Sequence, residues 1–214
     1  MKGIAALILA LCLSVPALAA EALPPRDRSM ADLFPAGYEC PGYTDVTEAD
    51  WFHTAAAVCC EVGLMRGMEG EFRPWQALTV GEIAAIAAPM NEALTGIPIP
   101  PPVPNPGLPW YQHHMDYLEE LGISLPDGEA PATRLEFVTL LAAVLPEECL
   151  SPINDIPPPP DTEAPAVLAF YRAGILAGRD SRGAFAGEEV LTRAEGAAIL
   201  ARIVRPELRL VAGF

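Results

Sequence analysis

Lysine is almost missing from this chain. Of its 13 basic residues only Lys2 is a lysine, whereas acidic residues number 28 and the formal net charge is −15. A chain with this charge is not expected to bind nucleic acid or an anionic surface through its overall field. Any anion must be held locally by arginines, whose planar guanidinium groups fit a carboxylate or a phosphate. A simpler interpretation is that the acidity keeps the protein soluble.

Long apolar runs are missing after the first residues. Lys2 precedes an apolar stretch from Ile4 to Val15 and then Ala17-Leu18-Ala19, a pattern that signal peptidases cleave. We therefore predict a signal peptide at residues 1–19, a secreted protein, and an N-terminal linker at residues 20–39. Removing Lys2 with the peptide changes the formal net charge from −15 to −16. No later segment approaches 18 uninterrupted apolar residues, so we expect no membrane span.

Motifs of common catalytic and metal sites are also missing. The chain has no nucleophile elbow, no HExxH helix and no phosphate-binding P-loop. Acid pairs such as Glu119-Glu120 are neighbours in sequence, so they do not share a helix face and cannot easily flank a glycosidic bond. His53, His113 and His114 have no carboxylates or thiols grouped with them at metal-ligand spacing. We expect a non-enzymatic protein without a metal or a cofactor.

Four cysteines follow the predicted signal peptide: Cys40, Cys59, Cys60 and Cys149. In an exported protein they could form two disulfides in one of three connectivities. The adjacent Cys59 and Cys60 would then each need a distant partner. Buried, reduced cysteines are the alternative interpretation. Zinc is less favoured, because the spacing matches no common ligand pattern.

Proline-rich stretches divide the mature chain. Residues 97–107 and 156–160 are expected to run as stiff polyproline spacers rather than as helix or central strand. Beside them lie three segments of similar size and a C-terminal tail: residues 40–96, 108–149, 151–206 and 207–214.

The three segments share a series of motifs. A first amphipathic helix stops at a glycine, and a turn then leads to Thr-x-x-Glu and a second amphipathic helix. In this capping box the threonine and the glutamate each bond the backbone N–H of the other. The boxes are Thr79 with Glu82, Thr133 with Glu136, and Thr192 with Glu195. A unit of two helices cannot bury its apolar faces alone, so we predict an all-α fold of three helix–turn–helix repeats packed into one bundle.

The sequence "LTRAE" at residues 191–195, with "AGILAG" upstream, resembles the S-layer homology module of bacterial surface proteins. The resemblance extends to three consecutive modules, of which the first two are degenerate. The resemblance implies a pseudo-threefold helical bundle at the bacterial cell wall or cell surface. It also implies non-covalent binding of anionic secondary cell-wall polysaccharide, often pyruvylated, in grooves between the modules.

The resemblance assigns a ligand contact to Arg193, which the capping box does not require. The N–H groups of the helix start favour an anion, and the arginine would add a bidentate grip. Arg134 occupies the same position in the second segment, whereas Val80-Gly81 replaces Arg-Ala in the first. We therefore expect at most two working grooves. Other motif positions that would line grooves are Asp45, Trp51, Gly67, Asp155 and Gly178.

Each of these residues also has an ordinary structural interpretation. The two arginines could be solvated or ion-paired, and Trp51 and Trp75 are expected to pack in the core or between units. The aspartates could cap turns, and the glycines could supply positive φ angles. An alternative function follows: a degenerate bundle that serves as a protein–protein interaction or envelope-organising module, with an envelope protein as partner and no glycan.

Overall fold

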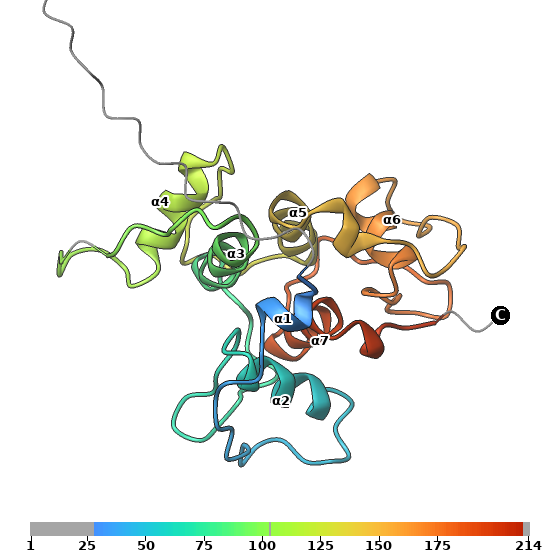
Figure 1. Cartoon of the computed structure of the whole chain (residues 1–214). Coiled ribbons are helices and arrows are strands. Elements are labelled where there is room, and N and C mark those ends of the chain that lie inside the picture. The colour runs from blue at the N-terminus through green and yellow to red at the C-terminus, as the bar shows by residue number, and fades with distance from the viewer. Residues whose placement is uncertain (1–27, 103, 212–214) are drawn as a thin grey trace, which may run out of the picture.

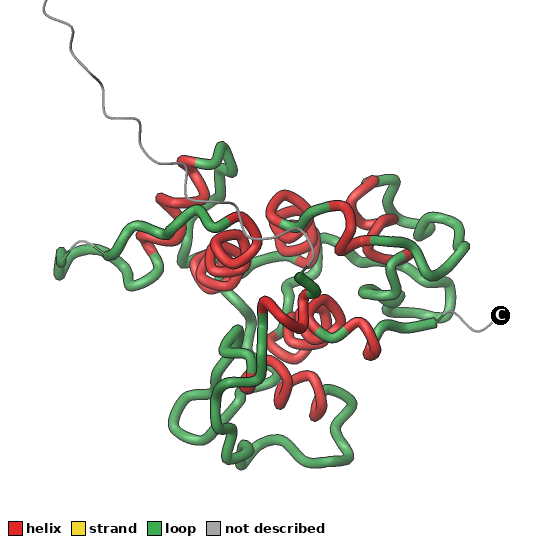
Figure 2. The backbone as a smooth tube through the Cα atoms, viewed as in Figure 1, coloured by secondary structure: helices red, strands yellow, loops and turns green. Residues whose placement is uncertain are grey.

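The computed structural model describes residues 28–102 and 104–211, so the predicted signal peptide and residues 212–214 lie outside the described part. Over these residues the chain is all-α, as predicted, with four isolated bridges and no β-strand. The helices are α1 (Met30–Leu33), α2 (His53–Glu61), α3 (Val80–Thr95), α4 (Gln112–Glu120), α5 (Arg134–Val144), α6 (Pro165–Arg172) and α7 (Arg193–Val204), with short 3-10 helices η1 (Glu147–Leu150) and η2 (Pro206–Leu208). Loops and turns connect them (Figure 2).

Helices α3, α5 and α7 gather at the centre of the molecule, and each carries one outer helix (Figure 1). α4 packs on α3, α6 packs on α5, and α2 packs on α7. Each outer helix therefore packs on the central helix of the sequence segment before its own, and the first segment closes onto the last. Helix pairs in space thus cross the boundaries between the three sequence segments.

The loops that enter the central helices are hydrogen-bonded to one another in a closed ring. The N–H of Leu78 donates to the carbonyl of Leu191, that of Leu191 to Ala132, and that of Ala132 back to Leu78, with distances of 2.9, 2.9 and 2.8 Å. The ring places the starts of α3, α5 and α7 next to one another. It is consistent with three repeated helix entrances, and the pseudo-threefold arrangement of whole units stays a prediction.

The local signals read from the sequence are confirmed at the helix ends. All three capping boxes are formed: Thr79 with Glu82, Thr133 with Glu136, and Thr192 with Glu195. The glycines that stop the first helices have positive φ angles: Gly63 at 77°, Gly122 at 81° and Gly174 at 71°. The N–H of the following residue bonds back to the helix in each case, as a Schellman ending requires.

The core follows the apolar faces of the central helices. The second helix of each segment is amphipathic as predicted, and its apolar face is buried: Ile83, Ile86, Ala87 and Met90 on α3, Phe137, Leu140, Leu141 and Val144 on α5, and Ala197, Leu200, Ile203 and Val204 on α7. In the first segment, the aromatic residue predicted to pack in the core is wrong by one position. Phe52 is 1% exposed and joins the core, whereas its neighbour Trp51 is 60% exposed.

Both terminal segments are docked rather than free over their described residues. Met30 and Phe34 are buried, α1 contacts α7, and Arg205 donates from Nη1 to the carbonyl of Phe34 at 3.1 Å. At the other end, the N–H of Leu210 donates to the carbonyl of Gly174. The described parts of the predicted linker and tail therefore belong to the folded body.

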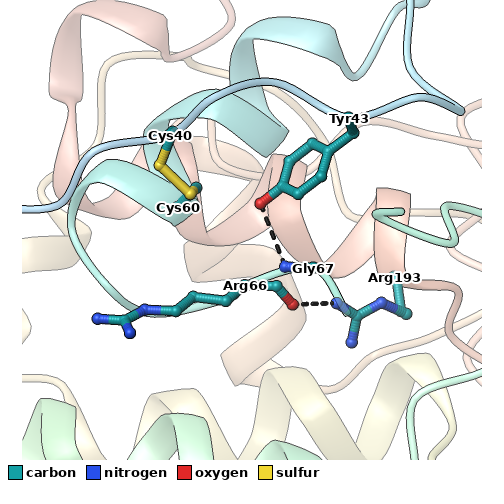
Figure 3. Close-up of a disulfide and its surroundings, with 6 residues drawn as sticks. All are labelled: Cys40, Tyr43, Cys60, Arg66, Gly67 and Arg193. Atoms are coloured by element: carbon teal, nitrogen blue, oxygen red, sulfur yellow. Dashed lines mark hydrogen bonds between the residues drawn. A yellow bond between two sulfur atoms is a disulfide. The ribbon is translucent and has the colours of Figure 1, made fainter. Parts of the chain in front are cut away.

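One disulfide joins Cys40 to Cys60 and fastens the N-terminal segment to α2 (Figure 3). Cys59 is a free, fully buried thiol, and Cys149 is a free, half-buried thiol. The four cysteines thus form one of the two disulfides that their number allows, and the adjacent cysteines have different states.

Candidate functional site

The first N–H groups of the central helices are already used within the chain. At the start of α7, Arg193 donates to the carbonyl of Gln76 and Ala194 to that of Pro74, while Glu195 donates to the Thr192 hydroxyl. The starts of α3 and α5 are satisfied in the same way by carbonyls of a neighbouring segment. The N–H of Val80 donates to the carbonyl of Ala130, and the N–H of Arg134 donates to that of Glu189. The prediction that these helix starts offer open donors to an anion is wrong, because neighbouring carbonyls satisfy them.

Arg193 extends from α7 into the first segment (Figure 3). Its Nε donates to the carbonyl of Phe72 and its Nη2 to that of Arg66, both at 2.8 Å. Its guanidinium carbon lies 5.2 Å from the centre of the Phe72 ring, and burial lowers the pKa of the group. Nη1 has a longer contact, 3.9 Å to Oε1 of Glu82. The Nε and Nη2 atoms, which were expected to hold a ligand together, therefore donate to carbonyls of the chain itself. Only Nη1 remains available to a ligand.

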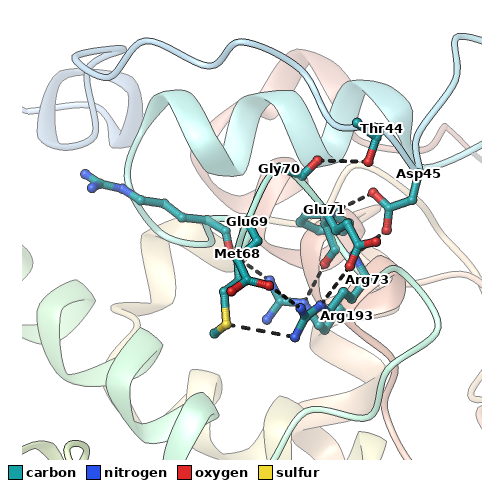
Figure 4. A network of polar contacts seen from close by, with 10 residues as sticks. Thr44, Asp45, Met68, Glu69, Gly70, Glu71, Arg73 and Arg193 are labelled. Atoms are coloured by element: carbon teal, nitrogen blue, oxygen red, sulfur yellow. Dashed lines mark hydrogen bonds and ion pairs between the residues drawn. The ribbon is translucent and has the colours of Figure 1, made fainter.

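Arg73 stands beside Arg193 on the turn between α2 and α3 (Figure 4). Its φ angle is 58°, a left-handed conformation that L-residues rarely adopt. Asp45 fixes this turn by accepting the N–H groups of Phe72 and Arg73 at 2.8 and 2.7 Å. The Arg73 side chain donates from Nε to Glu71 at 3.2 Å and lies 3.7 Å from Glu69. The turn thus holds a second guanidinium near Arg193.

Arg73 and Arg193 line a groove of about 330 Å³ between the first segment and its neighbours, the Arg193 groove. Its walls come from the turn after α2, from α3, from the start of α7, and from Trp110, which precedes α4. Charged residues among them are Arg66, Arg73 and Arg193 with Glu71 and Glu82. The carbonyl of Arg66 accepts from Arg193, but the Arg66 side chain points away from Arg193 (Figure 3). Its guanidinium carbon lies 3.7 Å from the centre of the Tyr38 ring. The groove therefore combines two cationic and two anionic side chains.

The glycines of the repeated motif are needed for close packing and not for positive φ angles. Neither Gly67 nor Gly178 has a positive φ angle, so that interpretation is wrong. A Cβ atom at Gly67 would overlap the Tyr43 ring and the carbonyl oxygen of Glu71, and one at Gly178 would overlap Gly183. The N–H of Gly67 also donates to the Tyr43 hydroxyl at 3.2 Å. Gly67 lines the groove at this tight contact.

At the seam between the second and third segments, the equivalent arginine is buried. Arg134 is 5% exposed and donates from Nε to the carbonyl of Phe185 at 3.0 Å, as Arg193 does to Phe72. Its Nη1 lies 3.6 Å from Glu195, and Glu195 is also paired with Arg179. Arg134 is therefore bonded to groups of the same chain, which favours its ordinary ion-paired interpretation over a ligand contact.

The seam between the first and second segments has no arginine, as the sequence predicts. Val80 is fully buried, and the ring of Tyr111 packs against Gly81 and Gly128 so closely that a Cβ atom at either glycine would overlap it. The hydroxyl of Tyr111 donates to Glu129, and this hydrogen bond raises the pKa of Tyr111 to about 12. At this seam an aromatic ring thus packs against the start of α3.

The aspartate of the third segment that corresponds to Asp45 is Asp161. Asp161 accepts the N–H groups of Phe185 and Ala186 at 2.8 and 2.7 Å, as Asp45 does those of Phe72 and Arg73. These two hydrogen bonds lower the pKa of Asp161. Asp155, the motif position predicted for the third segment from the resemblance, is exposed and takes no part in this turn, so it is not the counterpart of Asp45. Both true counterparts cap turns, as the ordinary interpretation proposed.

The tryptophans are exposed rather than packed in the core. Trp51 and Trp75 are 60% and 67% exposed, and both rings contact the buried Phe52 edge-on at 5.4 and 5.5 Å. The prediction that they are mainly packing residues is therefore wrong. Neither lines the Arg193 groove, whereas Trp110 does. Sequence reasoning missed Trp110, although it precedes Tyr111 and α4 as Trp51 precedes Phe52 and α2.

The remaining titratable candidates do not form a reactive cluster. Burial raises the pKa of the Cys59 thiol to about 12 and lowers that of His114 to about 4. The rings of His114 and His113 are tilted by 42° with centres 3.8 Å apart, and Nδ1 of His114 has no hydrogen-bond partner. Over residues 28–102 and 104–211, no three His, Cys, Asp or Glu side chains are grouped to hold a metal ion.

Comparison with protein-family models and with curated proteins finds no match to the chain. None of the helices in the described part is both long and apolar enough to cross a membrane.

Proposed function

We propose that this is a secreted bacterial cell-surface protein of the S-layer homology type that binds anionic cell-wall polysaccharide through one groove. The observation that carries the proposal is the position of Arg193, which lies at the seam between segments and lines a groove of about 330 Å³. A groove of this size accommodates a small part of a saccharide chain. The match of "LTRAE" and the capping box to that kind of module supports the same interpretation.

The charge distribution also supports local recognition. The formal net charge is −15, so the overall field repels an anionic polymer, and attraction must come from individual arginines. Arg193 is held by two carbonyls, which fixes the direction of its guanidinium before a ligand arrives. The other two seams are filled by Tyr111 and by the Arg134–Glu195–Arg179 cluster. We therefore assign a single groove.

A sedimentation assay with purified wall material tests the proposal. The mature chain is mixed with wall fragments that carry their secondary polysaccharide, before and after mild-acid removal of pyruvyl groups. Arg193→Lys keeps the positive charge but loses the planar fork. Because a charge-assisted hydrogen bond contributes about 1.5–3 kcal/mol, we expect retention to fall by about 10-fold or more.

Arg182→Lys is the matched control, since Arg182 is exposed and is paired with Asp180 outside the groove. It should bind like the unmodified chain, and circular dichroism should show unchanged helix content in both variants. Equal retention of the Arg193 and Arg182 variants would reject the groove as the binding site. Retention that does not change after pyruvyl removal would reject a pyruvylated ligand.

The alternative function is an envelope-organising module that binds a protein. Two observations favour it: Arg134 is buried by the chain's own groups, and Trp51 and Trp75 are exposed on the first segment. In that case the chain should not bind purified polysaccharide, and Trp51→Ala with Trp75→Ala should abolish co-purification of an envelope protein. The Arg193→Lys variant should retain that partner.

A further inference from the structure

The charged side chains of the Arg193 groove come as two cations and two anions. Arg193 and Arg73 are 13% and 37% exposed at their side chains, and Glu82 and Glu71 are 26% and 50% exposed. All four line the groove, so its two cationic side chains are accompanied by two anionic ones. The two carboxylates distinguish this groove from a site lined by cations alone.

Both glutamates have contacts within the chain that place them beside the arginines. Glu82 accepts the N–H of Thr79 with Oε2 as part of the capping box, and its Oε1 lies toward Arg193 at 3.9 Å. Glu71 accepts the Nε of Arg73 with Oε2 at 3.2 Å. Each carboxylate thus has one oxygen engaged in the chain and remains beside an arginine.

A ligand with only a negative charge therefore meets opposing forces in this groove. Its acidic group is attracted to Arg193 and Arg73 but is repelled by two fixed carboxylates a few ångströms away. A ligand that carries a positive group on the same sugar compensates both carboxylates. Complementarity to two positive and two negative groups thus favours a ligand with one charge of each sign.

We propose that the groove selects a zwitterionic sugar unit, an amino sugar with an unacetylated ammonium group and a carboxylate on the same ring. The carboxylate pairs with Arg193 and Arg73, and the ammonium pairs with Glu71 and Glu82. This inference rests on the proposed function, since it names the kind of saccharide that the same groove takes. Trp110 offers an exposed ring at the side of the groove for the apolar face of the sugar.

Three related sugars test the charge requirement by calorimetry on the mature chain. Muramic acid carries an ammonium and a carboxylate, N-acetylmuramic acid carries the carboxylate alone, and glucosamine carries the ammonium alone. We expect muramic acid to bind at least about 10-fold more tightly than either of the others, because each loses one charged contact.

Glu71→Gln combined with Glu82→Gln removes both negative charges, and glutamine still completes a capping box. In this variant muramic acid should bind more weakly and N-acetylmuramic acid more tightly, so that the preference disappears. A merely structural role of the glutamates would weaken both ligands alike. Glu119→Gln on the exposed end of α4 is the control and should leave the preference unchanged.

The outcomes separate the inference from the proposed function. Equal or tighter binding of N-acetylmuramic acid to the unmodified chain overturns the inference and leaves polysaccharide binding intact. Binding of wall material without binding of any of the three sugars also overturns it, because the groove then does not recognise a charge pair on one ring. Failure to bind both the sugars and wall material overturns the proposed function itself.

Discussion

Arg134 and Arg193 follow equivalent capping threonines, and each donates its Nε to the carbonyl of a phenylalanine in the next segment. The acceptors are Phe185 at 3.0 Å and Phe72 at 2.8 Å. Their exposure differs: the Arg134 side chain is 6% exposed and the Arg193 side chain 13%. Beside Arg134, Arg179 pairs with Glu195 and closes the seam, whereas Met68 occupies the corresponding place beside Arg193. The same motif residue thus serves as a structural clamp in one seam and lines a groove in the other.

Replacing Arg134 should therefore lower stability and not binding. Arg134→Met keeps much of the apolar stem but removes the hydrogen bond to the Phe185 carbonyl and the ion pair with Glu195. We expect the free energy of unfolding to fall by about 1–3 kcal/mol in urea titrations. Arg182→Met, at an 80% exposed side chain, should change it by less than about 0.5 kcal/mol. Loss of wall binding in folded Arg134→Met would contradict this division of roles.

The groove should also depend on the absence of a side chain at Gly67. Gly67→Ala places a Cβ against the Tyr43 ring and the Glu71 carbonyl, so the turn must shift. We expect a loss of about 1–3 kcal/mol in unfolding free energy, with weaker ligand binding. Gly37→Ala is the control, because the nearest atom to its Cβ would be 3.9 Å away and its φ angle is not positive. A Gly67→Ala variant as stable as Gly37→Ala would mean that Tyr43 moves without cost.

Asp161 should make stability depend on pH in a defined direction. Its pKa is lowered in the folded chain by the N–H groups of Phe185 and Ala186. Such a group stabilises the fold above its unfolded pKa of about 3.9, and the contribution is lost as the pH falls through the lower folded pKa. Asp161→Asn should therefore be less stable than the unmodified chain at pH 7, and the difference should shrink below about pH 4. Urea midpoints measured across this range provide the check.

Asp155→Asn is the matched control for that experiment, since Asp155 is exposed and lies outside the Phe185 turn. It should follow the unmodified chain at every pH. If Asp155→Asn and Asp161→Asn behaved alike, the assignment of Asp161 as the counterpart of Asp45 would fail.

The cysteines should differ in reactivity. In denaturant without reductant, alkylation should label Cys59 and Cys149, and only reduction should add Cys40 and Cys60. In the folded chain Cys149 should react before Cys59, which is fully buried and has a pKa of about 12. Peptide mapping distinguishes the sites.

Replacing both disulfide partners by serine tests what the bond contributes to stability. The partners are 20 residues apart, so we expect the variant to lose about 3 kcal/mol of unfolding free energy. In the unmodified chain, labelling of Cys60 without reductant would show that the disulfide does not form.

Signals carried by neighbouring residues could be predicted from the sequence. Thr192 and Glu195 are three residues apart, and Gly174 follows directly after its helix, so both the cap and the stop depend on local geometry. The apolar faces of α3, α5 and α7 follow helical spacing and are buried as expected. The all-α fold follows from these elements.

Features that depend on distant partners could not be predicted. Asp161 caps a turn 24 residues further on, and spacing alone favoured Asp155 because the stretch before α6 is shorter than that before α2. The burial of Arg134 is decided by Arg179 and Glu195, which belong to another segment. Trp51 and Phe52 are adjacent aromatic residues. Which of the two enters the core depends on how α2 is rotated against α7.

The packing of α2 on α7 also sets an order for folding. Cys59 on α2 donates to the carbonyl of Ala197 on α7, a contact between residues 138 positions apart in the chain. During synthesis from the N-terminus, α2 must wait for nearly the whole chain before its apolar face is covered, and such distant contacts slow folding. A nascent chain that stops before Leu191 can make only one of the three ring hydrogen bonds. Completion of the last segment is thus the event that turns a set of loosely associated helices into a single cooperative body.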